Sequence, residues 1–159
     1  PIPRTLSMVA YADLDCSVID ELPPGRPPVT TALVDSSRRE AVVARVAAAC
    51  DSGRQAYWVC TLIEESDVLQ AQAAEATAAE LRAGLPHLAI GLIHGRLKPL
   101  EKAAIMAAFK SGELALLVAT TVIEVGVDVP NACLLIIDNP AWCRLAHLHS
   151  LTRLVVRGF

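Results

Sequence analysis

The sequence predicts an α/β fold in which a parallel β-sheet is covered by helices on both faces. The run LALLVA at residues 114–119 is apolar without alternation, which is typical of a parallel strand buried on both sides. From Val29 onward, strand patterns and helix patterns alternate along the chain. That order favours a parallel sheet with right-handed crossovers.

The first 28 residues are expected to stand apart from this sheet. The chain opens with an extended Pro-x-Pro-Arg segment, and Thr5 can cap a short helix that reaches about residue 12. A stiff linker then contains Pro23, Pro24, Gly25, Pro27 and Pro28. We therefore place a domain boundary between residues 1–28 and residues 29–159.

Five strands and three helices are expected after the linker. The strand patterns are short runs of branched and aromatic residues at 29–34, 55–62, 88–93, 114–119 and 133–138. The helix patterns lie at 36–50, 66–84 and 99–110. Ser36 or Ser37 can cap the first helix, Gly84 can end the second, and Pro99 stands at the first position of the third.

The composition indicates a domain with a large core and no broad basic surface. Hydrophobic residues make up 53% of the 159 residues, yet no apolar run approaches the roughly 20 residues that a membrane span needs. Tyr57 and Trp58 are interpreted as core residues of their strand. The net charge of −3 argues against a stand-alone nucleic-acid binder, so any contact with DNA must be local.

The cysteines favour free thiols in a reducing cytoplasm. They are odd in number and form no CxxC pair: Cys16, Cys50, Cys60, Cys133 and Cys143. Cys143, His147 and His149 could be read as a metal site, but no fourth ligand lies nearby, so we predict no metal. No signal peptide is visible at the start of the chain.

Thr120 and Thr121 follow the buried strand at 114–119, at the end where open α/β sheets bind their ligands. A short helical turn that Gly126 closes, then Asp128 and Pro130, come next. A threonine there can cap the turn, and beside free backbone N–H groups it can also hold a phosphate. Capping alone remains an alternative.

A second strand end carries positive charge. His94, Gly95 and Arg96 follow the strand at 88–93, and Lys98 and Lys102 come shortly after. Gly95 allows a close approach of the backbone to a ligand, and the helix start at residue 99 offers free N–H groups. A phosphate backbone suits this turn, whereas a solvated basic turn is the alternative.

Several phosphate-binding motifs are absent from the sequence. There is no GxxxxGK[ST] loop, no acidic strand end followed by a helicase box, and no GxGxxG fingerprint. We therefore do not expect this chain to bind and hydrolyse ATP by itself.

Four segments together resemble the second motor lobe of RecG-type ATP-dependent DNA helicases. They match in order and spacing from residue 1 to about residue 140: PIPRTL, AYWVCTLIEES, GLIHGRLKPLEK and LLVATTVIEVGVDVPNA. The resemblance implies a RecA-like lobe of a superfamily 2 motor. Such a motor remodels stalled forks and recombination junctions in DNA repair, with ATP and Mg²⁺ bound in the complete helicase and none expected on this fragment alone.

The resemblance also implies roles for individual residues. Residues 1–28 would be the tail of the first motor lobe and the linker, and residues 29–159 a second lobe truncated at its C-terminus. DNA contacts would fall on Arg4, Thr5, His94, Gly95, Arg96, Thr120 and Thr121. Nucleotide would be sensed by Glu124, Gly126 and Asp128. The expected partners are branched DNA and the first RecA-like lobe, with self-association through the exposed cleft face as a further expectation.

The last residues depart from the family pattern. The family reads Q-L-R-G-R-V-G-R-G, with arginines that reach the triphosphate, whereas this chain reads S-L-T-R-L-V-V-R-G. Only Arg157 matches as the catalytic arginine, and Leu154 stands where another is expected. A degenerate, non-catalytic DNA- or protein-binding remnant is therefore the alternative function. A small-molecule α/β domain lacks any pocket signature in the sequence.

Overall fold

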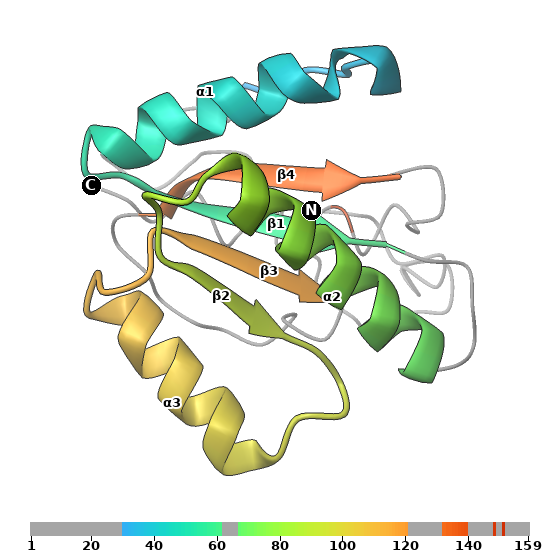
Figure 1. Ribbon diagram of the computed structural model, residues 1–159, viewed down its shortest axis with the longest axis vertical. Helices are drawn as coiled ribbons and strands as arrows, with labels where there is room; N and C mark the ends of the chain where they lie inside the picture. The colour runs from blue at the N-terminus through green and yellow to red at the C-terminus, as the bar shows by residue number, and fades with distance from the viewer. Residues whose placement is uncertain (1–29, 62–66, 121–131, 140–147, 149–150, 152–159) are drawn as a thin grey trace, which may run out of the picture.

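The computed structural model describes residues 30–61, 67–120, 132–139, 148 and 151. A 3₁₀ turn at Ser36–Arg38 precedes the first helix. The remaining elements are α1 (Arg39–Asp51), β1 (Gln55–Cys60), α2 (Asp67–Gly84), β2 (Ile90–Ile93), α3 (Pro99–Lys110), β3 (Leu116–Thr120) and β4 (Ala132–Asp138) (Figure 1).

The four strands form one parallel sheet in the order β2-β3-β1-β4. Every residue of β1 and β3 is buried. The unbroken apolar run at residues 114–119 predicted this burial for β3, whereas β1 also buries the polar Gln55. The predicted α/β fold with a parallel sheet is therefore confirmed. The strand that we predicted at 114–119 begins two residues later, at Leu116, and includes Thr120.

Helices cover both faces of the sheet, as predicted. Trp58 and Val118 point into a core with α1 and α2, and α2 crosses in front of the strands in Figure 1. Tyr57 and Val59 point the other way, into a core with α3 and Leu151. Adjacent residues of β1 thus serve opposite cores, because successive side chains of a strand point to opposite faces. Among the described helices, none is long and apolar enough to cross a membrane.

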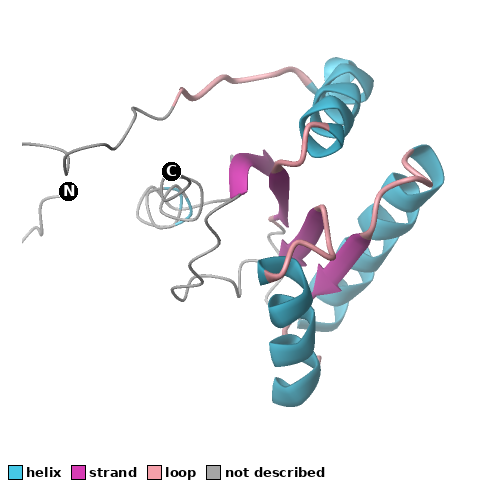
Figure 2. Cartoon of the chain, turned by 90° about the vertical axis from the view of Figure 1, so that its left-hand side faces the viewer, coloured by secondary structure: helices cyan, strands magenta, loops and turns pink. Residues whose placement is uncertain are grey.

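The strand predicted at residues 29–34 is wrong over its described part. Residues 30–34 form an exposed extended segment that leads into α1, and Leu33 is 92% exposed (Figure 2). None of the described strands pairs with this segment. Strand propensity mostly reflects burial and packing against neighbouring strands, so a suitable sequence alone does not produce a strand.

The start of α1 also differs from its prediction. The helix begins only at Arg39 and has no side-chain cap at its start, where Ser36 or Ser37 was expected to provide one. Asp35 instead caps the preceding 3₁₀ turn, and its carboxylate accepts a hydrogen bond of 2.9 Å from the Ser37 amide. This hydrogen bond lowers the pKa of Asp35. The other end of the helix is followed by Gly53 with φ +83°, a left-handed conformation that glycine adopts without steric cost.

Two side chains, the buried Gln55 and the partly exposed Arg39, tie distant elements to the sheet. The Gln55 amide donates to the carbonyl oxygens of Phe109 and Leu114, which anchors the end of α3 to the start of β1. Arg39 joins α1 to β4 through a 2.7 Å ion pair with Asp138. The Arg39 guanidinium also lies 5.1 Å from the centre of the Trp58 ring.

The thiols of the described residues should differ sharply in reactivity. Cys50, Cys60 and Cys133 are free, and only Cys133 is exposed. Burial raises the pKa values of Cys50 and Cys60 to about 11, so at pH 8 each carries about 100-fold less thiolate than an ordinary cysteine. In a chain with Cys16 and Cys143 replaced by serine, we expect an aromatic disulfide reagent to modify Cys133 rapidly. Cys50 and Cys60 should react only after urea is added, and rapid reaction of all three in buffer would contradict the described packing.

Candidate nucleic-acid interface

The carboxyl ends of the four strands meet at one edge of the sheet, as in every parallel sheet. In the pairing of β2 with β3, Ile93 stands opposite Ala119. The residues that follow, His94 and Thr120, therefore lie side by side at this edge. The two strand ends that the sequence marked as candidate sites are thus neighbours in the fold.

His94 is the first residue after β2 and is only 8% exposed. Its Nε2 lies 3.6 Å from Oε1 of Glu75 on α2. Its Nδ1 is buried and has no hydrogen-bond partner among the described residues. Because a buried polar atom without a partner is costly, this nitrogen is a candidate for contact with a ligand or water.

The basic turn follows His94 directly and leads into α3. Arg96 and Lys98 are exposed, and Gly95 is half-buried between them and His94. The Leu97 amide donates to the His94 carbonyl oxygen over 3.3 Å. Pro99 then starts α3, where its missing N–H costs nothing. Two exposed cations beside the positive end of a helix can bind a phosphate.

Thr120 ends β3 and is 2% exposed. Its Oγ1 has no hydrogen-bond partner among the described residues. The helical turn that we predicted after it lies outside those residues, so the capping and phosphate-binding alternatives stay open. The position of Thr120 beside His94 keeps it within the candidate interface.

Thr61 is a polar residue at this edge that the sequence analysis did not single out. It follows β1, is 3% exposed, and donates to the carbonyl oxygens of Asp138 and Asn139, the latter over 2.7 Å. A hydroxyl directly after a buried strand was the available signal. Its hydrogen bonds join the ends of β1 and β4, so its described role is structural.

The other predicted site residues lie outside the described residues, and their roles stay predictions. These are Arg4, Thr5, Thr121, Glu124, Gly126, Asp128 and Arg157. Within the described residues, no group of histidine, cysteine or acidic side chains is placed to hold a metal.

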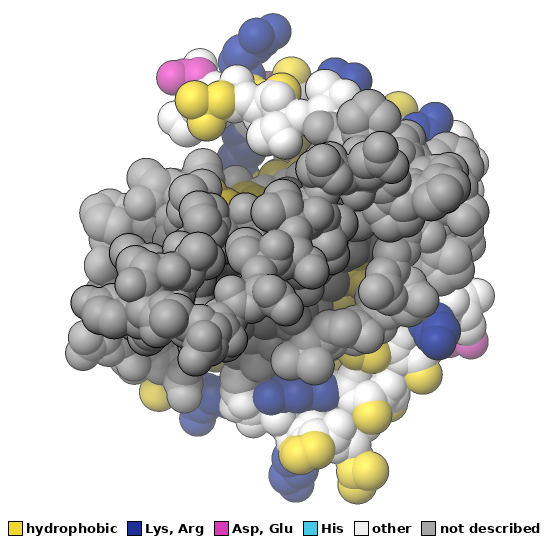
Figure 3. Space-filling model, turned by 180° about the vertical axis from the view of Figure 1, so that it is seen from behind, with side chains coloured by type: hydrophobic (Ala, Val, Ile, Leu, Met, Phe, Trp, Pro, Cys, Tyr) yellow, Lys and Arg dark blue, Asp and Glu magenta, His cyan; other side chains and the backbone are white. Residues whose placement is uncertain are grey.

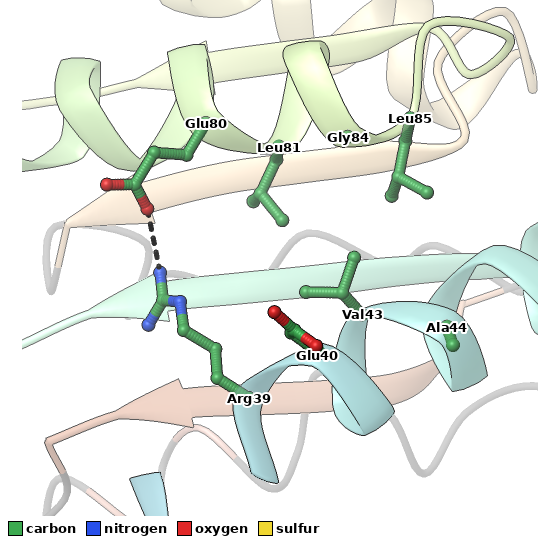
Figure 4. A pocket seen from close by; sticks show the side chains of 8 residues that line it. All are labelled: Arg39, Glu40, Val43, Ala44, Glu80, Leu81, Gly84 and Leu85. Atoms are coloured by element: carbon green, nitrogen blue, oxygen red, sulfur yellow. Dashed lines mark ion pairs between the residues drawn. The ribbon is translucent and has the colours of Figure 1, made fainter. Parts of the chain in front are cut away.

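The groove between α1 and α2 is separate from the candidate interface. It has a volume of about 420 Å³ and contains none of the predicted site residues. Figure 4 shows Leu81 and Val43 facing each other inside it, with the ion pair between Arg39 and Glu80 at one end. This groove is open and offers no cluster of reactive side chains.

The charge of the described surface is uneven. Figure 3 shows Lys and Arg side chains spread over the described part of the back face, with few acidic side chains among them. A net charge of −3 for the chain is therefore compatible with a locally positive surface. Binding of a phosphate backbone requires such a surface.

Comparison with known proteins identifies the chain. Residues 38–157 match the family described as helicase conserved C-terminal domain. The chain belongs to this family. As a helicase C-terminal domain, it is 67% identical over 159 residues to the ATP-dependent DNA helicase RecG of Escherichia coli strain K12, covering 99% of the chain and 23% of that protein. The corresponding protein of Thermotoga maritima is 45% identical, again with 99% of the chain and 20% of the relative covered.

The fold comparison agrees with the sequence comparison. A solved structure of RecG bound to a three-way DNA junction superposes on the helicase C-terminal domain with a TM-score of 0.78 and 42% identity. The match covers 99% of the chain and 20% of that protein. The predicted resemblance to RecG-type helicases is therefore confirmed, and the chain spans about a quarter or less of its relatives.

Proposed function

We propose that the chain acts as the second motor lobe of a RecG-type DNA helicase that works on branched DNA. Its similarity to RecG extends over almost its whole length, and the solved RecG structure that it resembles is a complex with a three-way DNA junction. In this proposal, residues 1–28 belong to the first lobe and its linker, and the first lobe is the main partner. The free thiols of Cys50, Cys60 and Cys133 are compatible with a reducing cytoplasm. In this proposal the cytoplasm is also where the DNA substrate lies.

The observation that supports the proposal most is that the two strand ends carrying predicted DNA contacts, those of β2 and β3, are neighbours in the sheet. Because β2 and β3 are neighbours, the basic turn after His94 and the buried hydroxyl of Thr120 lie at one place on the sheet edge. Arg96 and Lys98 would contact phosphate groups, with His94, Gly95 and Thr120 beside them. Phosphate contacts position a protein on DNA without reading its sequence, as a moving motor requires.

In this proposal, ATP and Mg²⁺ bind the complete helicase and not this chain alone. The relatives are ATP-dependent, and the residues expected near nucleotide are Glu124, Gly126, Asp128 and Arg157. No sequence for a phosphate loop is present, so the chain alone is expected to be inactive as an ATPase. Self-association through the face that would meet the first lobe remains a further proposal.

Replacing Arg96 and Lys98 with alanine should weaken binding of the chain to single-stranded DNA at every sequence tested. The plot of log K against log salt concentration should flatten by about 0.7 for each phosphate that the variant no longer neutralises. Fluorescence anisotropy with a labelled oligonucleotide, measured over a series of salt concentrations, would give both quantities.

Lys110→Ala is the matched control, because Lys110 is also an exposed cation but lies in the last turn of α3. Its removal takes away one positive charge, as Arg96→Ala alone does, without altering the basic turn. Equal losses of affinity in the Lys110 and Arg96 variants would show that binding follows overall charge, and the proposed interface would then be wrong.

A further inference from the structure

Lys102 differs from the other cations near the basic turn in having a hydrogen bond to the turn itself. Its Nζ donates to the carbonyl oxygen of Gly95 over 2.9 Å, and its side chain is partly buried. Arg96 and Lys98, by contrast, are exposed. The ammonium group of Lys102 is therefore directed toward the backbone of the protein.

A second side chain of the same helical turn holds the other end of the basic turn. The Glu101 carboxylate accepts a hydrogen bond of 2.9 Å from the Lys98 amide. Glu101 and Lys102 thus fix Lys98 and Gly95 respectively, with Arg96 between the two fixed points. Both hydrogen bonds involve a charged group, and such bonds are stronger than bonds between neutral groups.

We propose that Lys102 is a positioning residue for the DNA contact, which orients Arg96 through Gly95 without binding phosphate. This inference rests on the proposed function. A loop that is already ordered loses less conformational entropy when it binds, so fixing Gly95 favours the contact that Arg96 makes. Lys102 therefore contributes to DNA affinity only while Arg96 is present.

A double-mutant cycle tests this dependence. The variants of the full 159-residue chain are Lys102→Met, Arg96→Ala and the two combined, with Lys110→Met as control for the loss of one charge on the same helix. Residues that act through one another show non-additive effects. We expect Lys102→Met to weaken binding to a labelled single-stranded oligonucleotide about three- to tenfold in the original chain and less than about twofold when Arg96 is already alanine.

Two further measurements separate positioning from folding and from charge. Lys102→Arg keeps a donor and a positive charge, so this variant should bind DNA almost as tightly as the original chain. If Lys102→Met acted only by disturbing the packing, Lys102→Arg would be expected to weaken binding as well. Hydrogen exchange at the amides of Gly95 and Arg96 should be faster in Lys102→Met than in Lys110→Met, since the hydrogen bond from Lys102 to Gly95 is lost.

The outcomes distinguish this inference from the function on which it rests. Equal effects of Lys102→Met with and without Arg96 would mean that Lys102 binds phosphate directly, and the inference would be wrong. An effect of Arg96→Ala with none from Lys102→Met would also overturn it, while the proposed interface would stand. If Arg96→Ala leaves DNA binding unchanged, both proposals fail.

Discussion

Replacing Phe109 with alanine is expected to lower the free energy of unfolding of the chain by about 3–5 kcal/mol. The Phe109 side chain has no exposed surface, and its ring meets the Tyr57 ring edge-on, with centres 4.8 Å apart. It packs in the core between α3 and the sheet. The destabilisation would combine the loss of the buried ring, the cavity left behind and the missing aromatic contact with Tyr57.

The same position links the fold to the candidate interface. The Phe109 carbonyl oxygen accepts a hydrogen bond from Gln55, so the last turn of α3 is fixed to β1. The first turn of α3 carries Glu101 and Lys102, which hold the basic turn. Weakening the attachment of α3 should therefore also weaken DNA binding, by loosening the helix on which the basic turn rests.

Urea unfolding followed by circular dichroism would measure the change. Leu100→Ala on the same helix is the matched control, because Leu100 is 85% exposed and its loss should alter stability by no more than about 0.5 kcal/mol. Similar destabilisation by both substitutions would contradict the described packing of α3 against β1.

The sequence predicted those elements whose stability depends on local signals. The bounds of α3 agree with the prediction, because Pro99 fixes the start and a glycine with positive φ, Gly112, follows the end. β3 was recognised because a strand buried on both faces needs an unbroken apolar run, and β1 because branched and aromatic residues favour a strand. The alternation of these elements was sufficient to predict the fold class.

The order of strands could not be read from the sequence. A βαβ unit fixes the hand of a crossover, but it does not say which strands become neighbours. The adjacency of His94 and Thr120 depends on β3 lying between β2 and β1. The hydrogen bond from Lys102 to Gly95 is equally hidden, since it depends on the shape of the turn before α3.

The failed strand at residues 29–34 shows the same limit. Its residues have strand propensity, but a strand forms only where another strand satisfies its backbone groups. Serine and aspartate are about equally common at helix N-caps, so the sequence did not identify Asp35 as the residue that caps the 3₁₀ turn before α1.

Restoring the family's arginine at the position of Leu154 and its glycines at the positions of Arg153 and Val156 is expected to raise ATP hydrolysis in a complete helicase by about 10³-fold or more. The experiment would replace the matched segment of Escherichia coli RecG, 67% identical, with this chain and compare it with a version carrying Leu154→Arg, Arg153→Gly and Val156→Gly. The physical reason is that Leu154 replaces an arginine expected at the triphosphate, where a positive charge stabilises the transition state. Turnover stimulated by a three-way junction is the measurement.

A third chimera isolates the cause. It would carry only residues 30–139 of this chain, so that the rest of RecG, including its own arginine segment, is retained. All three chimeras share the same sheet and basic turn. If this chimera and the restored one hydrolyse ATP while the unrestored one does not, the lobe supports catalysis and its terminal segment causes the loss of activity. Equal activity of the unrestored chimera would show that Leu154 is compatible with catalysis. Inactivity of all three, with each folded, would favour the non-catalytic binding function.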